Sequence, residues 1–597
     1  MPGNKPTEAF GYTDGLEVEE RLLTIMRSAT DLSSTSSELE NAIIDWPSRY
    51  HLSSERANLF RAMDNLQDCA QVLELGAGCG ALTRYLGERF EKVDAIEGSL
   101  RRAQIARERC RDLLNVTVLA SPFKDIRFSP EYDLVALIGV LEYAPTLDEP
   151  SQRNRAENCL STIKSAACSL RRDGIMIIAM ENALGLKYWS GCAEDHTGTP
   201  FDSVHGYPVP NSPITFGRRQ LESLIRLSGF DHIAFYYPFP DYKLPRTIIR
   251  ETQIPPDSLF LHNWIECPFE DYTGRRDYHV HEGLAVRSIC RAGLLSEFAN
   301  SFLVLASKSP DTEIQASWIA RRFESQRALP YQRVTSLYVD PNPRVRKDRV
   351  IESSEEPSLL GLRPAMTRWI PGDLEIYSLD EAIFHPDPHS SILSILERYH
   401  KYLADIFSTN TNDEEGYPLL RGESFDFTFS NIIWNSELDR YEYIDDEWEW
   451  RGPLPVDYVL FRSLYYFMAT RRPYLRAKAA ETDLQQTFMS LMRALYPQYN
   501  FERHERNRLR EERVQSEIIG RSFTLASLST PLAERTSLLA LKVENDRLRE
   551  VIRLRDEGIK FLQGEVKVRD EGIKFLRESK LSSRIRRKLS WMIRKKP

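Results

Sequence analysis

The first half of the chain alternates short apolar runs with longer amphipathic stretches. A short apolar run predicts a buried strand, and apolar residues that recur every three or four positions predict a helix. Strands that alternate with helices are typical of a doubly wound parallel sheet. The pattern therefore predicts a Rossmann-like α/β fold, with strands at 71–75, 92–96, 133–138 and 174–180, helices at 81–89 and 154–171, and a last strand within 297–306.

The pattern changes after residue 308. Residues 333–351 predict two strands joined by the turn residues 340–343, and the apolar stretch 391–407 predicts a helix, so we expect an α+β domain there. From residue 537 apolar residues recur with heptad spacing, which is typical of a coiled coil. The predicted segments are a flexible N-terminal segment at 1–40, the α/β domain at 41–308, the α+β domain at 312–500, a linker at 501–536, the coiled coil at 537–580 and a basic tail at 581–597.

Composition narrows the class of protein. The chain has 597 residues, of which 42% are hydrophobic and 28% are charged, as in ordinary globular domains. A net charge of −8 argues against general binding to nucleic acid. The eight cysteines form no Cys-x-x-Cys pair, which indicates reduced thiols in a cytosolic protein. No run approaches the ~18 apolar residues of a spanning helix, so we expect a protein that is neither secreted nor transmembrane.

Three glycines at alternating positions follow the first predicted strand. Gly76, Gly78 and Gly80 allow positive φ angles and a close approach of the backbone to a ligand. Glu97 ends the next predicted strand, where a carboxylate can accept both ribose hydroxyls of an adenosine. The glycine spacing also fits the nucleotide fingerprint of a dehydrogenase, so the loop alone leaves NAD open as its ligand.

Neighbouring segments favour S-adenosylmethionine. Glu74 precedes the glycines, the predicted strand 133–138 leads into Gly139, and an edge-like segment contains Ser121 and Phe123. In order and spacing these segments resemble the motifs of class I methyltransferases. The resemblance implies that they bind S-adenosylmethionine, with Ser121 or Phe123 beside the adenine, where this family often has Asp or Asn. The alternative is an α/β core with an unused glycine turn.

A short helix is expected just before the first strand, with Ser53 as its cap. Its position suits Tyr50, His51 and Arg56 to the amino-acid end of the cofactor. The alternative is a capping helix with surface polar groups.

An unusual loop follows the strand 174–180, rich in glycine and aromatic residues. Loops at the carboxyl ends of strands carry the ligand sites of open α/β sheets. Glu181, Asp195 and His196 are therefore candidate acceptor-site groups, and His196 would serve as a base if a sugar hydroxyl is methylated. The alternative is that His196 is a structural residue. The proline-rich segment 236–245 is expected to be an acceptor-side insertion and a poor strand.

The second domain carries a lysine, an Asp-x-x-x-x-Asn pair and a later aspartate in the order of the kinase fold. These are Lys347, Asp426, Asn431 and Asp445. The resemblance implies that Lys347 holds ATP phosphates, that Asp426 positions the attacking hydroxyl, and that Asn431 and Asp445 ligate Mg²⁺. The sequence departs from the kinase pattern, because no glycine-rich loop precedes the lysine and Asp-Glu replaces Phe-Gly after Asp445.

The end of the chain predicts association with itself and with a membrane. The heptad stripe of 537–580 would be left unburied on a single helix, so we expect a homo-oligomer, a dimer or trimer. Residues 581–597 carry basic side chains without an acidic one, beside apolar residues on one side of a helix, which suits an anionic membrane surface. The alternatives are a solvated helix and a solvated or partner-binding tail.

Taken in order, these modules resemble the kinase–methyltransferases that cap bacterial O-antigen chains. The resemblance implies that the terminal sugar is phosphorylated and methylated, and that the rod sets chain length beside a membrane-associated polymerase. Expected partners are a polysaccharide or lipid-linked glycan acceptor, a glycosyltransferase or polymerase, and the inner face of the cell membrane. Two alternatives stay open: a coiled-coil scaffold whose kinase-like domain has lost its chemistry, and a methyltransferase of a small molecule or protein.

Overall fold

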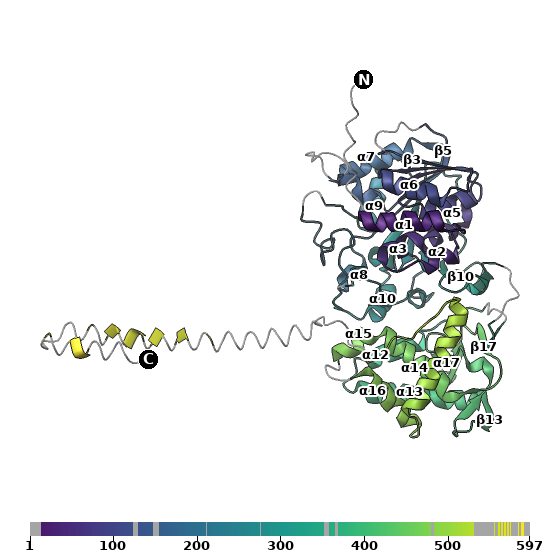
Figure 1. Cartoon of the computed structure of the whole chain (residues 1–597), viewed down its shortest axis with the longest axis vertical. Coiled ribbons are helices and arrows are strands. Elements are labelled where there is room, and N and C mark those ends of the chain that lie inside the picture. The colour runs from purple at the N-terminus through teal and green to yellow at the C-terminus, as the bar shows by residue number, and fades with distance from the viewer. Residues whose placement is uncertain are drawn as a thin grey trace. The chain divides into compact units, whose positions relative to one another are not determined.

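The computed structural model (Figure 1) divides the chain into two compact units, residues 1–533 and 534–597. In the first unit it describes residues 14–122, 129–146, 155–209, 212–274, 276–351, 357–363, 368–478 and 483–529. In the second it describes scattered positions between Arg555 and Leu589, all helical. Most of the predicted coiled coil and tail therefore lies outside the described residues.

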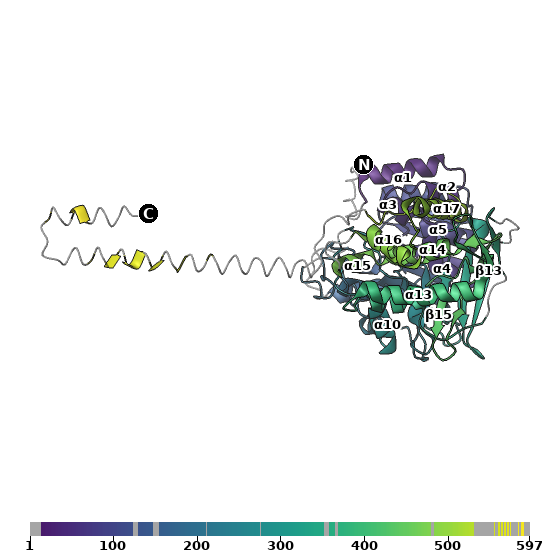
Figure 2. The same ribbon diagram turned by 90° about the horizontal axis from the view of Figure 1, so that it is seen from below.

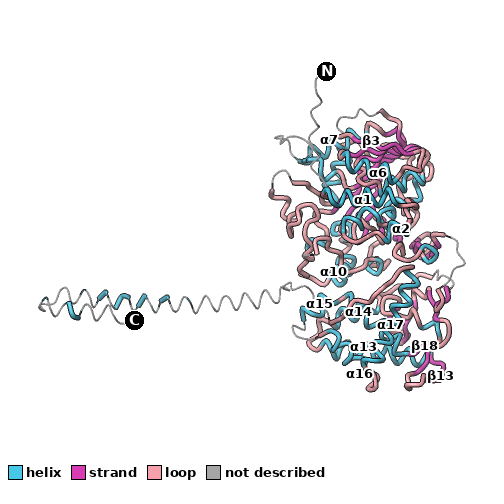
Figure 3. The backbone as a smooth tube through the Cα atoms, in the orientation of Figure 1, coloured by secondary structure: helices cyan, strands magenta, loops and turns pink. Residues whose placement is uncertain are grey.

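The described part of the first unit is built on one sheet of eleven strands, in the order β11-β10-β9-β7-β6-β8-β5-β4-β1-β2-β3. Strands β3, β2, β1, β4 and β5 are parallel, and all pairs from β5 to β11 are antiparallel. Figure 3 shows these strands in magenta with helices in cyan around them. The strands are β1 Gln71–Leu75, β2 Lys92–Glu97, β3 Val116–Ala120, β4 Tyr132–Ile138, β5 Leu170–Glu181, β6 His232–Phe239, β7 Thr247–Arg250, β8 Ser301–Ser307, β9 Ala320–Phe323, β10 Arg333–Tyr338 and β11 Arg344–Arg349.

Helices cover both faces of the parallel part, as the uninterrupted apolar strands require. On β1, Leu73 packs into one core and Val72 into another, because successive side chains point to opposite faces. The first core is covered by α7 (Arg155–Ala167) and α9 (Arg218–Leu227). The second is covered by α4 (Asn58–Arg61) and α5 (Ala81–Arg89). This arrangement confirms the predicted Rossmann-like fold.

The predicted flexible N-terminal segment is instead largely folded. Helix α1 (Leu16–Ser28) buries Leu22 and Met26 against α6 (Leu100–Arg109), and α2 (Ser37–Asn41) and α3 (Trp46–Leu52) complete the layer (Figure 2). The polar composition of 1–40 hid an apolar stripe that repeats every three to four residues. This segment belongs to the α/β domain.

The segment 236–245 also differs from expectation. Its first residues are the end of β6, and Pro238 pairs with Ile248 of the neighbouring antiparallel strand β7. The remainder forms the loop to β7, which carries Asp241 and Lys243. Proline is tolerated here because the pairing of β6 with β8 ends at Tyr236, so Pro238 has a strand neighbour on one side, as at a sheet edge.

The two predicted domains share a sheet. Strands β10 and β11 form the predicted hairpin, yet β9 joins them to β7 of the α/β domain. The predicted domain boundary near 308–312 therefore does not fall between two sheets, because one sheet includes strands from both sides of it. A second apolar core begins with the helices and small sheets that follow β11.

The helices of the second core are α12 (Glu375–Ala382), α13 (Pro388–Phe407), α14 (Val456–Thr470), α15 (Arg472–Lys478), α16 (Leu484–Leu495) and α17 (Phe501–Ile519). The small strands are β12 (Leu360–Leu362), β13 (Ser408–Asn412), β14 (Pro418–Leu420), β15 (Ile432–Asn435), β16 (Arg440–Tyr443), β17 (Trp448–Trp450) and β18 (Leu454–Pro455).

The predicted linker 501–536 begins with α17, a helix of this core. Val514 packs into the core, and the fully buried Glu511 accepts hydrogen bonds from Tyr458 and Arg462 of α14 at 2.7 and 2.8 Å. The helix is rich in charged residues, and two of them form buried ion pairs with α14, Arg503 with Asp457 and Glu511 with Arg462. The second domain therefore extends beyond residue 500. Within the residues that the structure describes, no helix has the length and apolarity to cross a membrane.

Candidate active site

The loop between β1 and α5 turns at three glycines with left-handed backbone angles. The φ angle is +85° at Gly76, +55° at Gly78 and +82° at Gly80, values that other residues rarely adopt. A Cβ atom on Gly76 would lie 2.3 Å from a methyl carbon of Val140, in the loop after β4. Because β1 lies between β2 and β4, these loops meet where the strand order reverses, the usual ligand site of open α/β sheets.

Glu97 lies at the tip of β2 and faces this loop. Its carboxylate accepts the backbone N–H of Gly78 at 2.7 Å and that of Ser99 at 2.9 Å. The Ser121 N–H donates to the Glu97 carbonyl at 3.0 Å, so the predicted adenine-side and ribose-side residues are neighbours. Phe123 lies outside the described residues. A carboxylate fixed by two amides still has lone pairs for ribose hydroxyls.

Glu74, Arg56 and Tyr50 gather beside the same loop. Burial raises the pKa of Glu74 to about 7, although the Thr83 hydroxyl, which donates to it at 2.6 Å, and the nearby Arg56 lower it. The Arg56 guanidinium lies 4.2 Å from the ring centroid of Tyr50 and donates to the Lys243 carbonyl at 3.0 Å. A buried arginine here suits the carboxylate at the amino-acid end of the cofactor.

A buried network of charged side chains lies beyond the carboxyl ends of β4 and β5. It begins beside Gly139, where a Cβ atom would lie 2.7 Å from the Tyr242 hydroxyl. Its members come from η4 (Leu141–Thr146), β5, α8 (Leu186–Trp189), the loop after α8, and the β6–β7 loop. They are Glu142, Glu181, Lys187, Asp195, His196, Asp241 and Lys243.

Two lysines neutralise most of these carboxylates. Lys243 pairs with Glu181 and lies 3.3 Å from Asp195. Lys187 pairs with Asp195 and lies 3.1 Å from Asp241. Although burial opposes it, the charges of Lys243 and His196 hold the pKa of Glu181 well below its usual range. Glu181 is therefore an ionised partner for His196.

His196 connects Glu181 to Tyr143. Its Nε2 lies 3.0 Å from a Glu181 carboxylate oxygen and its Nδ1 lies 3.0 Å from the Tyr143 hydroxyl. Burial alone would lower the pKa of His196, but Glu181, with Glu194 and Glu142, raises it to about 9. A carboxylate on Nε2 keeps the proton there in the neutral ring, so Nδ1 is the atom that accepts a proton.

Glu142 is the remaining acid of this network. Its side chain is fully buried, it lies 4.0 Å from Nε2 of His196, and burial raises its pKa to about 7. Donor atoms of Glu142, Glu181 and His196 lie within 4.8 Å of one another, the spacing of metal ligands. Lys243 is already bonded to Glu181 and supplies a positive charge. The arrangement fits a proton relay better than a cation site.

Sequence reasoning selected Glu181, Asp195 and His196, and the structure brings them together. Lys187 and Lys243 were not predicted. Lys243 pairs with Glu181, 62 positions away in the chain, and Lys187 contacts Asp241, 54 positions away. The prolines around 236–245 marked the right loop without identifying its lysine.

The four predicted residues of the second domain are also brought together. Lys347, on β11, pairs with Asp445, which follows β16. Burial would lower the pKa of Lys347, but Asp445 raises it. The Asn431 amide donates to the Asp426 carbonyl at 2.9 Å, and the Ile444 N–H donates to the Asn431 carbonyl at 2.9 Å. These contacts, together with the effect of the Asp445 charge on Asp426, make the four residues neighbours.

Asp426 is the most perturbed acid of this group. Its carboxylate accepts the backbone N–H groups of Glu447 and Trp448, each at 3.2 Å. Burial, followed by the charge of Asp445 and that of Glu447, raises the pKa of Asp426 to about 7 against the effect of Arg462. Clustered carboxylates with raised pKa values are typical of functional sites.

Comparison with protein families identifies the first of these two sites. Residues 72–162 match the family described as "Methyltransferase domain". The match spans β1 to α7 and includes the glycine loop, Glu97 and Glu142. The chain therefore contains a methyltransferase domain, and S-adenosylmethionine is its cofactor. No curated protein matches the chain.

Solved structures give only distant likenesses. A phosphoethanolamine N-methyltransferase 2 of Haemonchus contortus is 16% identical over 42% of this chain and 52% of its own, with a TM-score of 0.27. The alignment thus spans about half the length of the nematode protein. A methyltransferase of Thermotoga maritima is 18% identical over 44% of this chain and 91% of its own, with a TM-score of 0.25.

Proposed function

We propose that this chain is an S-adenosylmethionine-dependent O-methyltransferase that acts on a hydroxyl of the terminal sugar of a bacterial surface polysaccharide and so caps the chain. One observation carries the choice of a hydroxyl: the hydrogen-bonded series Tyr143–His196–Glu181 beyond β4 and β5. A hydroxyl must lose its proton when it is methylated, and this series supplies a base. Transfer to a phosphate oxygen would require none.

The proposed reaction divides its tasks among these residues. The acceptor oxygen attacks the methyl carbon, an O–CH₃ bond forms, and the S–CH₃ bond breaks to leave S-adenosylhomocysteine. The acceptor proton passes to Nδ1 of His196, directly or by exchange through the Tyr143 hydroxyl. Glu181 balances the positive charge of the imidazolium, and Lys243 holds Glu181 in place. His196 thus acts as the general base.

The choice of a polysaccharide rests on the order of modules along the chain. A methyltransferase followed by a kinase-like module and a heptad rod resembles the O-antigen-capping family. We propose that the second domain binds ATP and Mg²⁺, with Asn431 and Asp445 as oxygen ligands of the metal and Lys347 on the phosphates. The pairing of Lys347 with Asp445, and the closeness of Asn431 to Ile444, support this assignment. Mg²⁺ supplies charge neutralisation of the phosphates.

A direct experiment decides whether phosphorylation precedes methylation. Full-length protein would be incubated with labelled S-adenosylmethionine and mannose- or rhamnose-terminated oligosaccharides, with and without ATP and Mg²⁺. We expect label to enter the unphosphorylated glycan without nucleotide, and a methyl ether by mass spectrometry. If methylation occurred only with ATP and gave a phosphate methyl ester, Tyr143, His196 and Glu181 would have a structural role instead of a catalytic one. Absence of both products with every glycan would favour the small-molecule, protein or scaffold alternatives.

The rod and tail are proposed to hold the enzyme as an oligomer on the inner face of the cell membrane, next to the polymerase. The support is the heptad pattern of 537–580 and the excess of basic residues in 581–597. Flotation with anionic liposomes would test the tail: the full chain should float at low salt and a chain ending at Lys580 should remain below. Equal flotation of both would show that the tail is not the anchor.

A further inference from the structure

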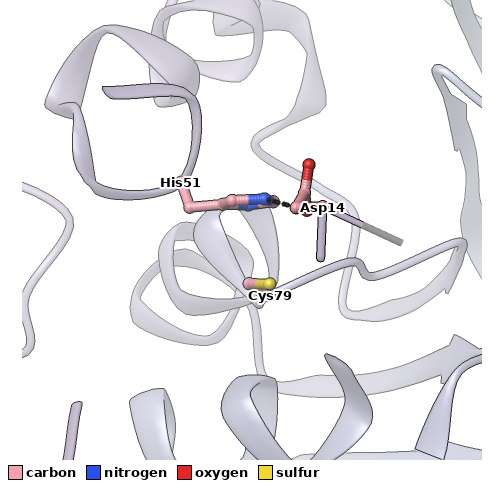
Figure 4. A group of neighbouring side chains, drawn as sticks. All are labelled: Asp14, His51 and Cys79. Atoms are coloured by element: carbon pink, nitrogen blue, oxygen red, sulfur yellow. Dashed lines mark hydrogen bonds and ion pairs between the residues drawn. The ribbon is translucent and has the colours of Figure 1, made fainter. Parts of the chain in front are cut away.

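Three side chains with metal-ligand chemistry meet behind the cofactor loop (Figure 4). Asp14 precedes α1, His51 lies on α3, and Cys79 lies in the glycine loop. Nε2 of His51 is 2.9 Å from a carboxylate oxygen of Asp14, and one donor atom from each of the three lies within 4.8 Å of the others. His51 and Cys79 are 2% and 1% exposed, and the Asp14 side chain is 14% exposed, so the cluster is largely shielded from solvent and opens to it at Asp14.

We infer that Asp14, His51 and Cys79 bind a zinc ion. An imidazole nitrogen, a thiolate sulfur and a carboxylate oxygen are the ligand types that Zn²⁺ prefers. Zinc bonds of about 2.0–2.3 Å at tetrahedral angles separate the ligand atoms by roughly 3.3–3.7 Å. To reach that geometry the Asp14–His51 pair, now 2.9 Å apart, opens by about 0.4 Å, and the distances to Cys79, at most 4.8 Å, close by no more than about 1.5 Å. A water molecule would complete the tetrahedron, as in zinc sites with three protein ligands.

Electrostatics of the surroundings permit a dication. Arg102 approaches the loop, since its guanidinium lies 3.2 Å from the position of a Cβ atom on Gly78, and its charge is felt at Asp14. A zinc complex with a carboxylate, a thiolate, an imidazole and water has no net charge, so Arg102 does not repel it. The thiol packs beside Leu52 and Ile105, and its polar interaction is with the His51 ring, the second proposed ligand.

A zinc ion here would join the N-terminal layer to the cofactor loop. Cys79 lies between Gly78, whose N–H binds the Glu97 carboxylate, and Gly80, the N-cap of α5. Fixing Cys79 would order the loop before the cofactor arrives, which lowers the entropy cost of binding. By linkage, zinc and S-adenosylmethionine would then tighten each other's binding by the same factor.

Metal analysis of the full-length protein tests the inference. After removal of metals and reloading with zinc, we expect one zinc ion per chain by mass spectrometry. Substitution with Co²⁺ should give the intense visible bands of a tetrahedral site and a sulfur-to-cobalt charge-transfer band. Zinc well below one per chain after reloading, or a cobalt spectrum without the sulfur band, would overturn the site.

Ligand variants assign the metal to these side chains. Cys79→Ser and Asp14→Asn should each weaken zinc binding by at least about 100-fold, since even second-shell changes cost 10–100-fold. Cys168→Ser removes an exposed thiol and should bind zinc as the wild type does. Circular dichroism checks that each variant is folded, and Asp14→Asn decides the question if Cys79→Ser is not. Full zinc binding by a folded Asp14→Asn protein would contradict the assignment.

Calorimetry with S-adenosylmethionine tests the coupling. We expect a several-fold lower Kd for the zinc-loaded wild type than for the metal-free protein, and no such difference in Asp14→Asn. Equal Kd values in the wild type would show that the ion, if bound, does not order the loop. This measurement needs no acceptor, so it is independent of the proposed sugar substrate.

Discussion

Two buried clusters of carboxylates in this chain use similar residues to different effect. Around His196, the lysines Lys187 and Lys243 pair with the acids, and the pKa of Glu181 is held well below its usual range. Around Asp426, Lys347 pairs with Asp445 alone, and the pKa of Asp426 is raised to about 7. Burial raises the pKa of both acids. Glu181 is paired directly with Lys243 and His196, whereas the cations near Asp426 pair with its neighbours Asp445 and Glu447, and this difference decides the outcome.

This difference in charge balance indicates which chemical role suits each cluster. A network already balanced by lysines keeps Glu181 ionised, so the glutamate can orient and charge a histidine base. A cluster with an unneutralised carboxylate gains from a bound cation or from a proton. The first site is thus balanced by its own lysines, and the second retains a carboxylate that the proposed Mg²⁺ would neutralise.

The largest effect is expected from removing the general base of the first cluster. His196→Gln removes the proton acceptor and should lower the rate of methyl transfer by about 10²–10⁴-fold, with little change in the Kd for S-adenosylmethionine. Initial rates with the acceptor oligosaccharide would measure the rate of methyl transfer. Calorimetry would measure the Kd for S-adenosylmethionine. His205→Gln changes an exposed histidine of the same segment and should retain the wild-type rate. A wild-type rate in His196→Gln would remove the base from the mechanism.

A third buried carboxylate sharpens the comparison, because Glu97 is held by two backbone amides instead of cations. Glu97→Ala should weaken S-adenosylmethionine binding by roughly 1.5–3 kcal/mol for each lost ribose hydrogen bond, since the acceptor is charged. Calorimetry on the full chain measures it. Glu91→Ala, just before β2, provides a matched control. Undiminished affinity in Glu97→Ala would contradict its role at the ribose.

The pH dependence of the rate tests the charge of Glu181. His196 accepts a proton only when neutral, and its pKa is about 9, so the rate should rise up to about pH 9 and fall about tenfold per unit below it. In Glu181→Gln the apparent pKa should drop toward the ordinary value of about 6.5. Asp241→Asn, which removes a carboxylate bonded to Lys187, should leave the profile near 9. An unshifted profile in Glu181→Gln would mean that another group titrates.

The smallest expected effect concerns the second cluster. A carboxyl with a raised folded-state pKa contributes stability below its unfolded pKa, near 3.8, and loses it as the pH rises through about 7. Asp426→Asn avoids this loss and should stabilise the protein at pH 8 by on the order of 1–3 kcal/mol, and by less at pH 5. Thermal unfolding at both pH values measures the gain. Asp405→Asn, exposed on α13, should change stability little, and a destabilised Asp426→Asn would show that the carboxylate is satisfied as it stands.

Segments that the sequence placed well are those in which strand, loop and helix are contiguous. The glycine loop, Glu74 and Glu97 lie within one strand–helix–strand unit, so their chemistry and their position follow from the same stretch of chain. Apolar runs identified the parallel strands β1, β2, β4 and β5 for the same reason, whereas the partly exposed edge strand β3 was not predicted. The order Lys347, Asp426, Asn431 and Asp445 was also visible, although the strand carrying Lys347 belongs to the sheet of the first domain.

Charged residues were the ones that the sequence misplaced. The N-terminal 40 residues and the segment 501–519 look polar, yet α1 and α17 are packed against cores, and Glu511 is fully buried. Whether a charged side chain is solvated or paired depends on residues far away in the chain, as with Glu511 and Arg462. Local composition contains no such information.

By itself, the sequence determined the α/β alternation, the cofactor loop and the candidate base, because each depends on periodicity or on glycine and histidine at one local position. Only the tertiary structure decided the charge state of that base and which side chains pair with each carboxylate. Lys243 reaches Glu181 across 62 positions of sequence, and Asp14, before α1, meets Cys79, in the glycine loop, at His51. Electrostatic interactions depend on distance in space and on burial, and both exist only once the chain has folded.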